Sequence, residues 1–188
     1  KYTLRNSDHY IELERKGLIL INSLVMLFLG IVSWVLLHNI WLSLLLQIMP
    51  FTSANLTEHV FTKVSPEPVL LIAVAALVLL LIRYYASEKR DGRRFALLFA
   101  LASGFGLATK ATFLPLLLIP VLLLENNMLR KRFAGFFILF FVLFTLPAVP
   151  QYPHMAKWFV LLFAHFGTYG GGGLGVINVA QYLNDLAK

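Results

Sequence analysis

The feature that most constrains this chain is a series of apolar runs separated by short basic connections. Residues 17–37, 69–82 and 133–149 are almost entirely apolar. The first run is long enough to cross a hydrocarbon layer of about 30 Å at about 1.5 Å per residue. A water-soluble domain of this length would leave a large apolar surface exposed. The sequence therefore predicts an all-α fold, a polytopic transmembrane helical bundle.

The composition and the position of the charges support a membrane protein. Hydrophobic residues make up 59% of the chain and charged residues 13%, whereas a soluble domain is about half apolar. The formal net charge is +7, but the cations gather in the connections 83–94 and 130–132. That placement is typical of cytoplasmic loops. We therefore expect the lipid bilayer as the partner and no nucleic acid.

The apolar segments predict a single transmembrane domain over residues 1–188. We expect cytoplasmic loops at 83–94 and 125–132, outer loops at 52–66 and 150–157, and an outer tail at 167–188. The predicted apolar segments are about 17–37, 39–51, 67–84, 95–109, 111–128, 133–149 and 156–166.

One polar interruption decides the expected topology of the middle of the chain. Residues 95–124 are apolar apart from Thr109 and Lys110, and basic loops flank them on both sides. Both ends must then face one compartment, so the segment crosses an even number of times. We expect 95–109 to leave the cytoplasm and 111–124 to return, with Lys110 near the far surface. The arms are short, which favours tilted or partly re-entrant helices.

The beginning of the chain permits two arrangements. Arg15 and Lys16 favour a cytoplasmic N-terminus with residues 39–51 in the membrane interface, whereas a tight hairpin at His38 and Asn39 places the N-terminus outside. The family resemblance described below favours the hairpin. Because the chain begins with Lys1 and a stretch of mixed charge without a signal-peptide pattern, we expect an excerpt from a longer protein.

Two charged residues are the sharpest candidates for function. Lys110 places an ammonium between apolar arms, which is costly unless the ammonium faces water, a partner or an anion. A lysine that snorkels at a helix end is the alternative. Glu67 lies between Pro66 and Pro68 at the outer mouth of a helix, where a carboxylate is held for a substrate or ion. A first-turn acid that favours the helix dipole is the alternative there.

A second group of candidates surrounds the glycines at 170–173. His154, His165 and Tyr169 are expected in this outer region, where a histidine serves as acid, base or ligand, or where all three only anchor the chain at the interface. Their spacing matches no metal signature, and the chain has no cysteine, so no metal site is predicted. Asn55-Leu56-Thr57 fits an N-glycosylation acceptor.

One stretch of sequence resembles a known enzyme family. Ser65-Pro66-Glu67-Pro68-Val69-Leu70 is followed by a crossing, a basic loop and the glycine-spaced stretch 101–110, which ends in Thr-Lys. This arrangement resembles the polyprenyl-phosphate-sugar glycosyltransferases of the protein-mannosyltransferase and aminoarabinose-transferase type, the membrane-embedded type C enzymes. The likeness is best over residues 65–124. The matching positions are Glu67, Gly104, Gly106, Thr109 and Lys110.

The resemblance implies a specific reaction. A sugar passes, with inversion at its reacting carbon, from a polyprenyl-phosphate donor to an acceptor on the outer face of the membrane. An acid in the first outer loop acts as the base; no residue here matches it, so it is expected upstream of Lys1. Lys110 would meet the donor phosphate, Glu67 would orient the acceptor or the lysine, and His165 and Tyr169 are further substrate-binding candidates.

Other classes of membrane protein remain open at this point. In a transporter or flippase segment, Lys110 would pair with a carboxylate along a translocation path, and Gly104 and Gly106 would serve as hinges. In a non-catalytic membrane subunit, the charged residues would only decorate an interface. For the enzyme, the resemblance implies a multi-pass protein of the cytoplasmic membrane of a prokaryote. No cofactor, sugar, acceptor or oligomeric state is assigned.

Overall fold

The computed structural model describes residues 7–52, 57, 65–87, 91–154, 156, 157 and 160. These residues are overwhelmingly helical, and none of them lies in a strand, so the all-α prediction is confirmed for them. The chain divides into two compact units, Lys1–Phe144 and Thr145–Lys188. The elements, with η marking 3-10 helices, are α1 (Ser7–Leu37), α2 (Ile40–Ile48), η2 (Met49–Phe51), α4 (Glu67–Ala86), α5 (Gly92–Thr109), η3 (Ala111–Leu117), α6 (Leu118–Leu123), α7 (Asn127–Thr145) and η4 (Leu146–Gln151).

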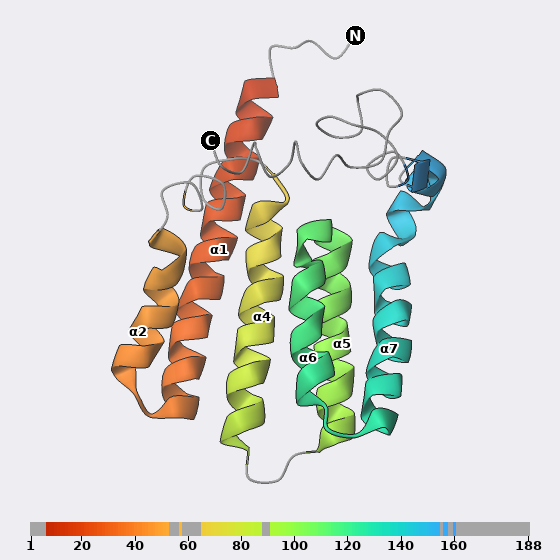
Figure 1. Cartoon of the computed structure of the whole chain (residues 1–188). Helices are drawn as coiled ribbons and strands as arrows, with labels where there is room; N and C mark the ends of the chain where they lie inside the picture. Colours follow the sequence, from red (N-terminus) through yellow and green to blue (C-terminus); the bar gives the residue numbers. More distant parts are fainter. Residues whose placement is uncertain are drawn as a thin grey trace, which may run out of the picture. The chain divides into compact units, whose positions relative to one another are not determined.

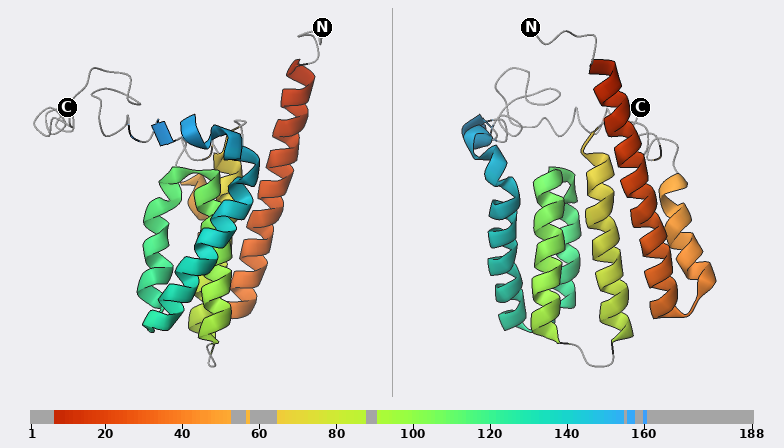
Figure 2. Two further views of the ribbon diagram at one scale, coloured as in Figure 1. Left: turned by 90° about the vertical axis from the view of Figure 1, so that its right-hand side faces the viewer. Right: turned by 180° about the vertical axis from the view of Figure 1, so that it is seen from behind.

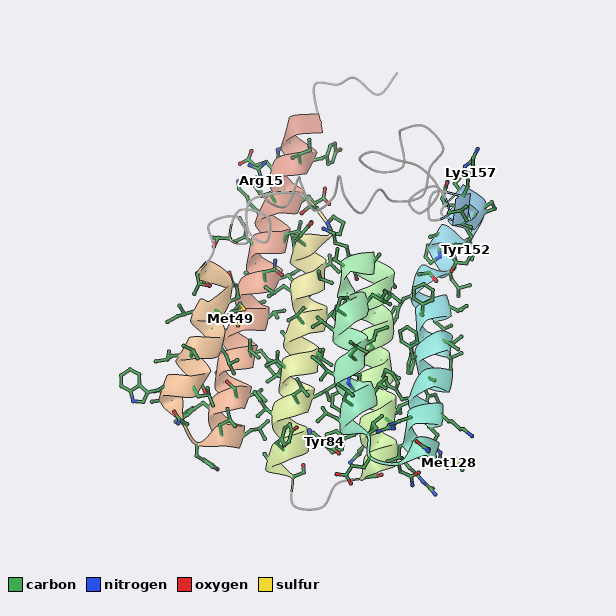
Figure 3. All side chains as sticks on the ribbon, viewed as in Figure 1. Arg15, Met49, Tyr84, Met128, Tyr152 and Lys157 are labelled. Atoms are coloured by element: carbon green, nitrogen blue, oxygen red, sulfur yellow. The ribbon has the colours of Figure 1, made fainter. Side chains whose placement is uncertain are left out.

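Successive helices of the first unit run in alternating directions (Figure 1). The order across the unit is α2, α1, α4, the α5–α6 hairpin and α7, and the views in Figure 2 agree with it. The α1–α2 turn, the end of α4, the start of α5 and the α6–α7 connection lie at one end, at the bottom of Figure 1. Tyr84 and Met128, both labelled in Figure 3, mark this basic end. The α5–η3 junction and the start of α4 lie at the opposite end.

The turn between α1 and α2 is tight, as the hairpin alternative required. His38 adopts a positive φ of 51°, and its N–H donates to the Trp34 carbonyl at 2.8 Å, which closes α1. Asn39 caps α2, because its side-chain oxygen accepts from the Leu42 N–H at 3.1 Å. An asparagine at this position satisfies a backbone donor that the new helix leaves unpaired. The reversal is therefore encoded by the two residues expected to make it.

The hairpin that returns from Lys110 has unequal arms. Its first arm is α5, whereas the second is a 3-10 helix followed by a short α-helix, with Pro115 and Pro120 inside it. The lengths come to about 27 Å for α5 and about 23 Å for the returning arm, because a 3-10 helix rises about 2 Å per residue. The 3-10 turns thus lengthen an arm that would otherwise fall further short of α5.

The main apolar core lies between α4, α5, the returning arm and α7. Ala96, Phe99 and Ala100 of α5 and Phe113 of η3 are fully or almost fully buried in it. Two polar contacts hold the basic end: the Tyr84 hydroxyl donates to the Leu123 carbonyl at 3.1 Å, and Arg130 Nε donates to the Leu124 carbonyl at 2.7 Å. Both satisfy carbonyls that the end of α6 leaves without helical partners.

Three helices are long and apolar enough to cross a membrane, judged by length and composition: His9–Leu37, Glu67–Ala86 and Asn127–His154. In the most apolar 18-residue stretch of each helix, only 28%, 28% and 11% of the residues, respectively, are buried in the structure. Exposing so much aliphatic and aromatic surface to water would be energetically unfavourable. The chain is accordingly a helical membrane protein, with lipid or further protein covering these faces.

Several boundaries differ from the expected segments. The expected loop 125–132 is largely helical, since α7 begins at Asn127, where the Asn126 side-chain oxygen accepts from the Met128 N–H at 2.9 Å. The returning arm ends at Leu123 rather than near residue 128. The expected outer loop 150–157 contains helical turns through His154. Pro147 lies in the first turn of η4, where a helix needs no N–H, and Pro150 lies inside the same 3-10 helix.

Candidate functional site

The two charged candidates form an ion pair. Lys110 Nζ donates to Glu67 Oε1 across 43 positions of sequence, at the end of the helices away from the basic connections. The lysine side chain is 36% exposed and the glutamate side chain 21%. Both groups are thus partly withdrawn from solvent and partly reachable from it. The sequence allowed either a snorkelling or a functional role for the Lys110 ammonium. In the structure this ammonium has a carboxylate partner on a neighbouring helix.

Local sequence holds the carboxylate in place. Pro66 caps α4 and Glu67 is its first residue, followed by Pro68, which is fully buried. Proline at the start of a helix is already set to the helical φ and lacks a donor that would go unused there. Ser65 adds its hydroxyl to the same carboxylate, and Glu67 Oε2 is buried. In the sequence, the signal for this contact is the position of Ser65 two residues before a first-turn acid.

The backbone on both sides of Lys110 is equally constrained. Lys110 is extended, with φ −158° and ψ 134°, between α5 and η3. Its N–H donates to the Gly106 carbonyl at 3.1 Å, and its carbonyl accepts from the Phe113 N–H at 3.0 Å. The Thr109 hydroxyl turns back to the Phe105 carbonyl at 2.9 Å. The lysine therefore projects from a fixed corner rather than from a frayed helix end.

The two glycines before this corner permit close packing. A Cβ on Gly104 would lie 2.9 Å from Phe140 Cβ and 3.0 Å from the backbone nitrogen of Phe141, both on α7. A Cβ on Gly106 would lie 2.6 Å from the Phe113 ring of the returning arm. Small residues allow such close approach between membrane helices. Gly104 thus brings α7 against α5, and Gly106 brings the returning arm under the Lys110 corner.

The remaining candidates lie in the second unit or outside the described residues. His154 is exposed within the second unit. His165 and Tyr169 lie outside the described residues, as does Asn55 of the glycosylation pattern, whose Thr57 donates to the Pro50 carbonyl at 3.3 Å. Within the described part of the chain, no three metal-binding side chains come together.

An apolar groove of about 600 Å³ runs between α1, α4 and α5 and reaches Phe144 of α7. Ile72, Ala76 and Leu79 line it, and Arg83 stands at its basic end. Neither Glu67 nor Lys110 belongs to its walls. The groove and the ion pair are therefore separate features of the unit.

Chemically, the pair provides a positioned ammonium. Nζ carries three donor hydrogens, and Glu67 Oε1 takes one direction, which leaves donors for an external acceptor. A lysine held this way can meet a phosphate or carboxylate while the glutamate fixes its position. In comparisons with protein-family models, curated proteins and solved structures, none matches the chain.

Proposed function

We propose that this chain is part of a multi-pass glycosyltransferase of the prokaryotic cytoplasmic membrane. It would transfer a sugar from a polyprenyl-phosphate-linked donor to an acceptor on the non-cytoplasmic face. The observation that carries the proposal is the Glu67–Lys110 ion pair at the end of the helices opposite both basic connections. Basic connections favour the cytoplasmic side, so the pair would face the compartment in which such a donor presents its sugar.

The proposed chemistry follows from charge. When the bond from the sugar to the lipid phosphate breaks, the leaving phosphate gains negative charge, and a fixed cation stabilises that charge most in the transition state. Lys110 would supply the cation. Glu67 would hold the ammonium in position, and the general base would come from a part of the enzyme other than residues 1–188.

The location of the pair favours this reading over a transporter. Transporter sites lie near the bilayer midplane, usually where a membrane helix is interrupted. Glu67 opens α4 and Lys110 follows the last residue of α5, so the pair sits at helix ends. A helix end at the membrane surface suits a phosphate that a lipid carries at the interface.

The experiment for this proposal uses the full-length protein purified in detergent and a polyprenyl-phosphate donor with a radiolabelled sugar. We expect the label to leave the donor and appear on an acceptor in the presence of the protein. Movement of the intact donor across vesicle membranes without sugar release would support a flippase instead. If neither sugar transfer nor donor movement is observed, a non-catalytic subunit is the remaining interpretation.

The orientation of the pair can be measured separately by cysteine labelling. Residues 1–188 contain no cysteine. In a full-length protein freed of any other cysteine, the single variants Lys110→Cys, Arg93→Cys and Lys131→Cys therefore report one site each. In intact cells, a membrane-impermeant maleimide should label position 110 and spare positions 93 and 131, which should react only after lysis. Labelling of all three from one side would contradict the proposed sidedness.

A further inference from the structure

A second polar site lies at the basic end of the first unit. An open pocket of about 520 Å³ is lined by residues at and near the N-terminal ends of α5 and α7. Its lining residues are Asp91, Arg93, Arg94, Leu97, Arg132 and Phe136. It shares no residue with the Glu67–Lys110 pair.

The charge in this pocket is strongly positive. Arg93, Arg94 and Arg132 bring three guanidinium groups to it, against the single carboxylate of Asp91. That carboxylate already accepts from the backbone N–H groups of Arg93 at 3.1 Å and Arg94 at 3.3 Å. Among the described residues, none of the three guanidinium groups forms an ion pair. The pocket therefore gathers cations whose mutual repulsion a bound anion would relieve.

The apolar part of the lining continues away from the charges along both helices. Leu97 follows Arg93 by one helical turn, and Phe136 follows Arg132 by one turn, so each pair shares a helix face. Leu97 and Phe136 remain 37% and 38% exposed. The cationic part of the pocket thus adjoins a partly exposed apolar part formed by Leu97 and Phe136.

We propose that this pocket binds an anionic phospholipid, with the phosphate between Arg93, Arg94 and Arg132 and an acyl chain against Leu97 and Phe136. Guanidinium groups bind phosphate oxygens through paired N–H donors. Basic pockets between membrane helices on the cytoplasmic side suit anionic head groups. The proposal does not depend on the glycosyltransferase reading, since its residues lie at the other end of the helices.

The test measures binding of fluorescent phosphatidylglycerol to the full-length protein in phosphatidylcholine nanodiscs. The triple variant Arg93→Gln, Arg94→Gln and Arg132→Gln should bind the probe on the order of tenfold more weakly, or worse. The control triple, Arg15→Gln, Lys131→Gln and Lys157→Gln, removes the same charge from exposed positions outside the pocket. Its affinity should stay within about twofold of the parent.

Neighbouring single variants give a matched pair that does not depend on the triple variant folding. Lys131 and Arg132 are adjacent on α7, but only Arg132 lines the pocket. Arg132→Gln should weaken probe binding severalfold, while Lys131→Gln leaves it unchanged. Equal losses from the two would show a general surface-charge effect and overturn the site. Displacement of the probe by inorganic phosphate at comparable concentration would show a free-anion site and overturn the assignment to a lipid.

Discussion

Replacing Lys110 by alanine is expected to lower sugar transfer from the lipid-linked donor on the order of 100-fold, the usual cost of one group that stabilises transition-state charge. In the proposed reaction, the ammonium would face a phosphate whose negative charge grows as the sugar departs. The measurement is the initial rate of label transfer by the full-length protein at saturating donor. The loss should appear in kcat more than in KM, because the interaction strengthens in the transition state.

The single variant leaves Glu67 only 21% exposed and without its cation, which carries a folding cost of its own. The double variant Glu67→Gln with Lys110→Ala removes both charges and separates catalysis from folding. It should recover folded yield while transfer stays low. The matched control is Lys16→Ala, which breaks an exposed pair with Glu12, 2.7 Å apart, and should leave activity unchanged. Full activity in the double variant would end the role assigned to Lys110.

Substituting alanine for Gly104 is expected to destabilise the protein by about 1–3 kcal/mol, the usual cost of overpacking a close contact. The added Cβ would meet Phe140 Cβ at 2.9 Å and the Phe141 backbone nitrogen at 3.0 Å. A backbone atom cannot rotate away as a side chain can, so α7 would have to move from α5. Reversible unfolding of the full-length protein in mixed micelles measures the change.

Gly135 provides the matched control on α7. Its added Cβ would meet nothing within 4 Å, so Gly135→Ala should be neutral or slightly stabilising, since alanine is the better helix former by about 1 kcal/mol. Gly106→Ala should fall between the two, because the obstructing group there is the Phe113 ring rather than backbone. Equal stability of the Gly104 and Gly135 variants would mean that α5 and α7 do not pack as closely as described.

These two predictions separate two features that lie close together along α5. Gly104 and Gly106 act on the packing of α5 against its neighbours, whereas Lys110 acts at the end of the helix. A Gly104 variant with lowered stability and normal transfer at low temperature would be consistent with both assignments. The motif on which the resemblance rests therefore contains packing positions, Gly104 and Gly106, and a position with a proposed chemical role, Lys110.

Much of the local structure could be read from particular residues. The apolar runs predicted the membrane-length helices, and the isolated Thr109-Lys110 predicted the reversal after α5. His38 and Asn39 offered a first reversal, but the residues alone left an interfacial helix open as the alternative. The helix boundaries were less predictable. Asn126 as a cap moves six expected loop residues into α7, and Pro147 and Pro150 change the type of helix rather than ending it.

The sequence by itself determined which segments are apolar enough to cross a membrane and that the chain reverses at Thr109 and Lys110, because hydropathy and isolated charges act through neighbours along the chain. Only the tertiary structure decided that Lys110 meets Glu67, that Gly104 meets α7, and that Arg93 and Arg132 share a pocket. Each of these contacts joins residues on different helices. Which faces meet depends on how the helices pack together, and no local pattern carries that information.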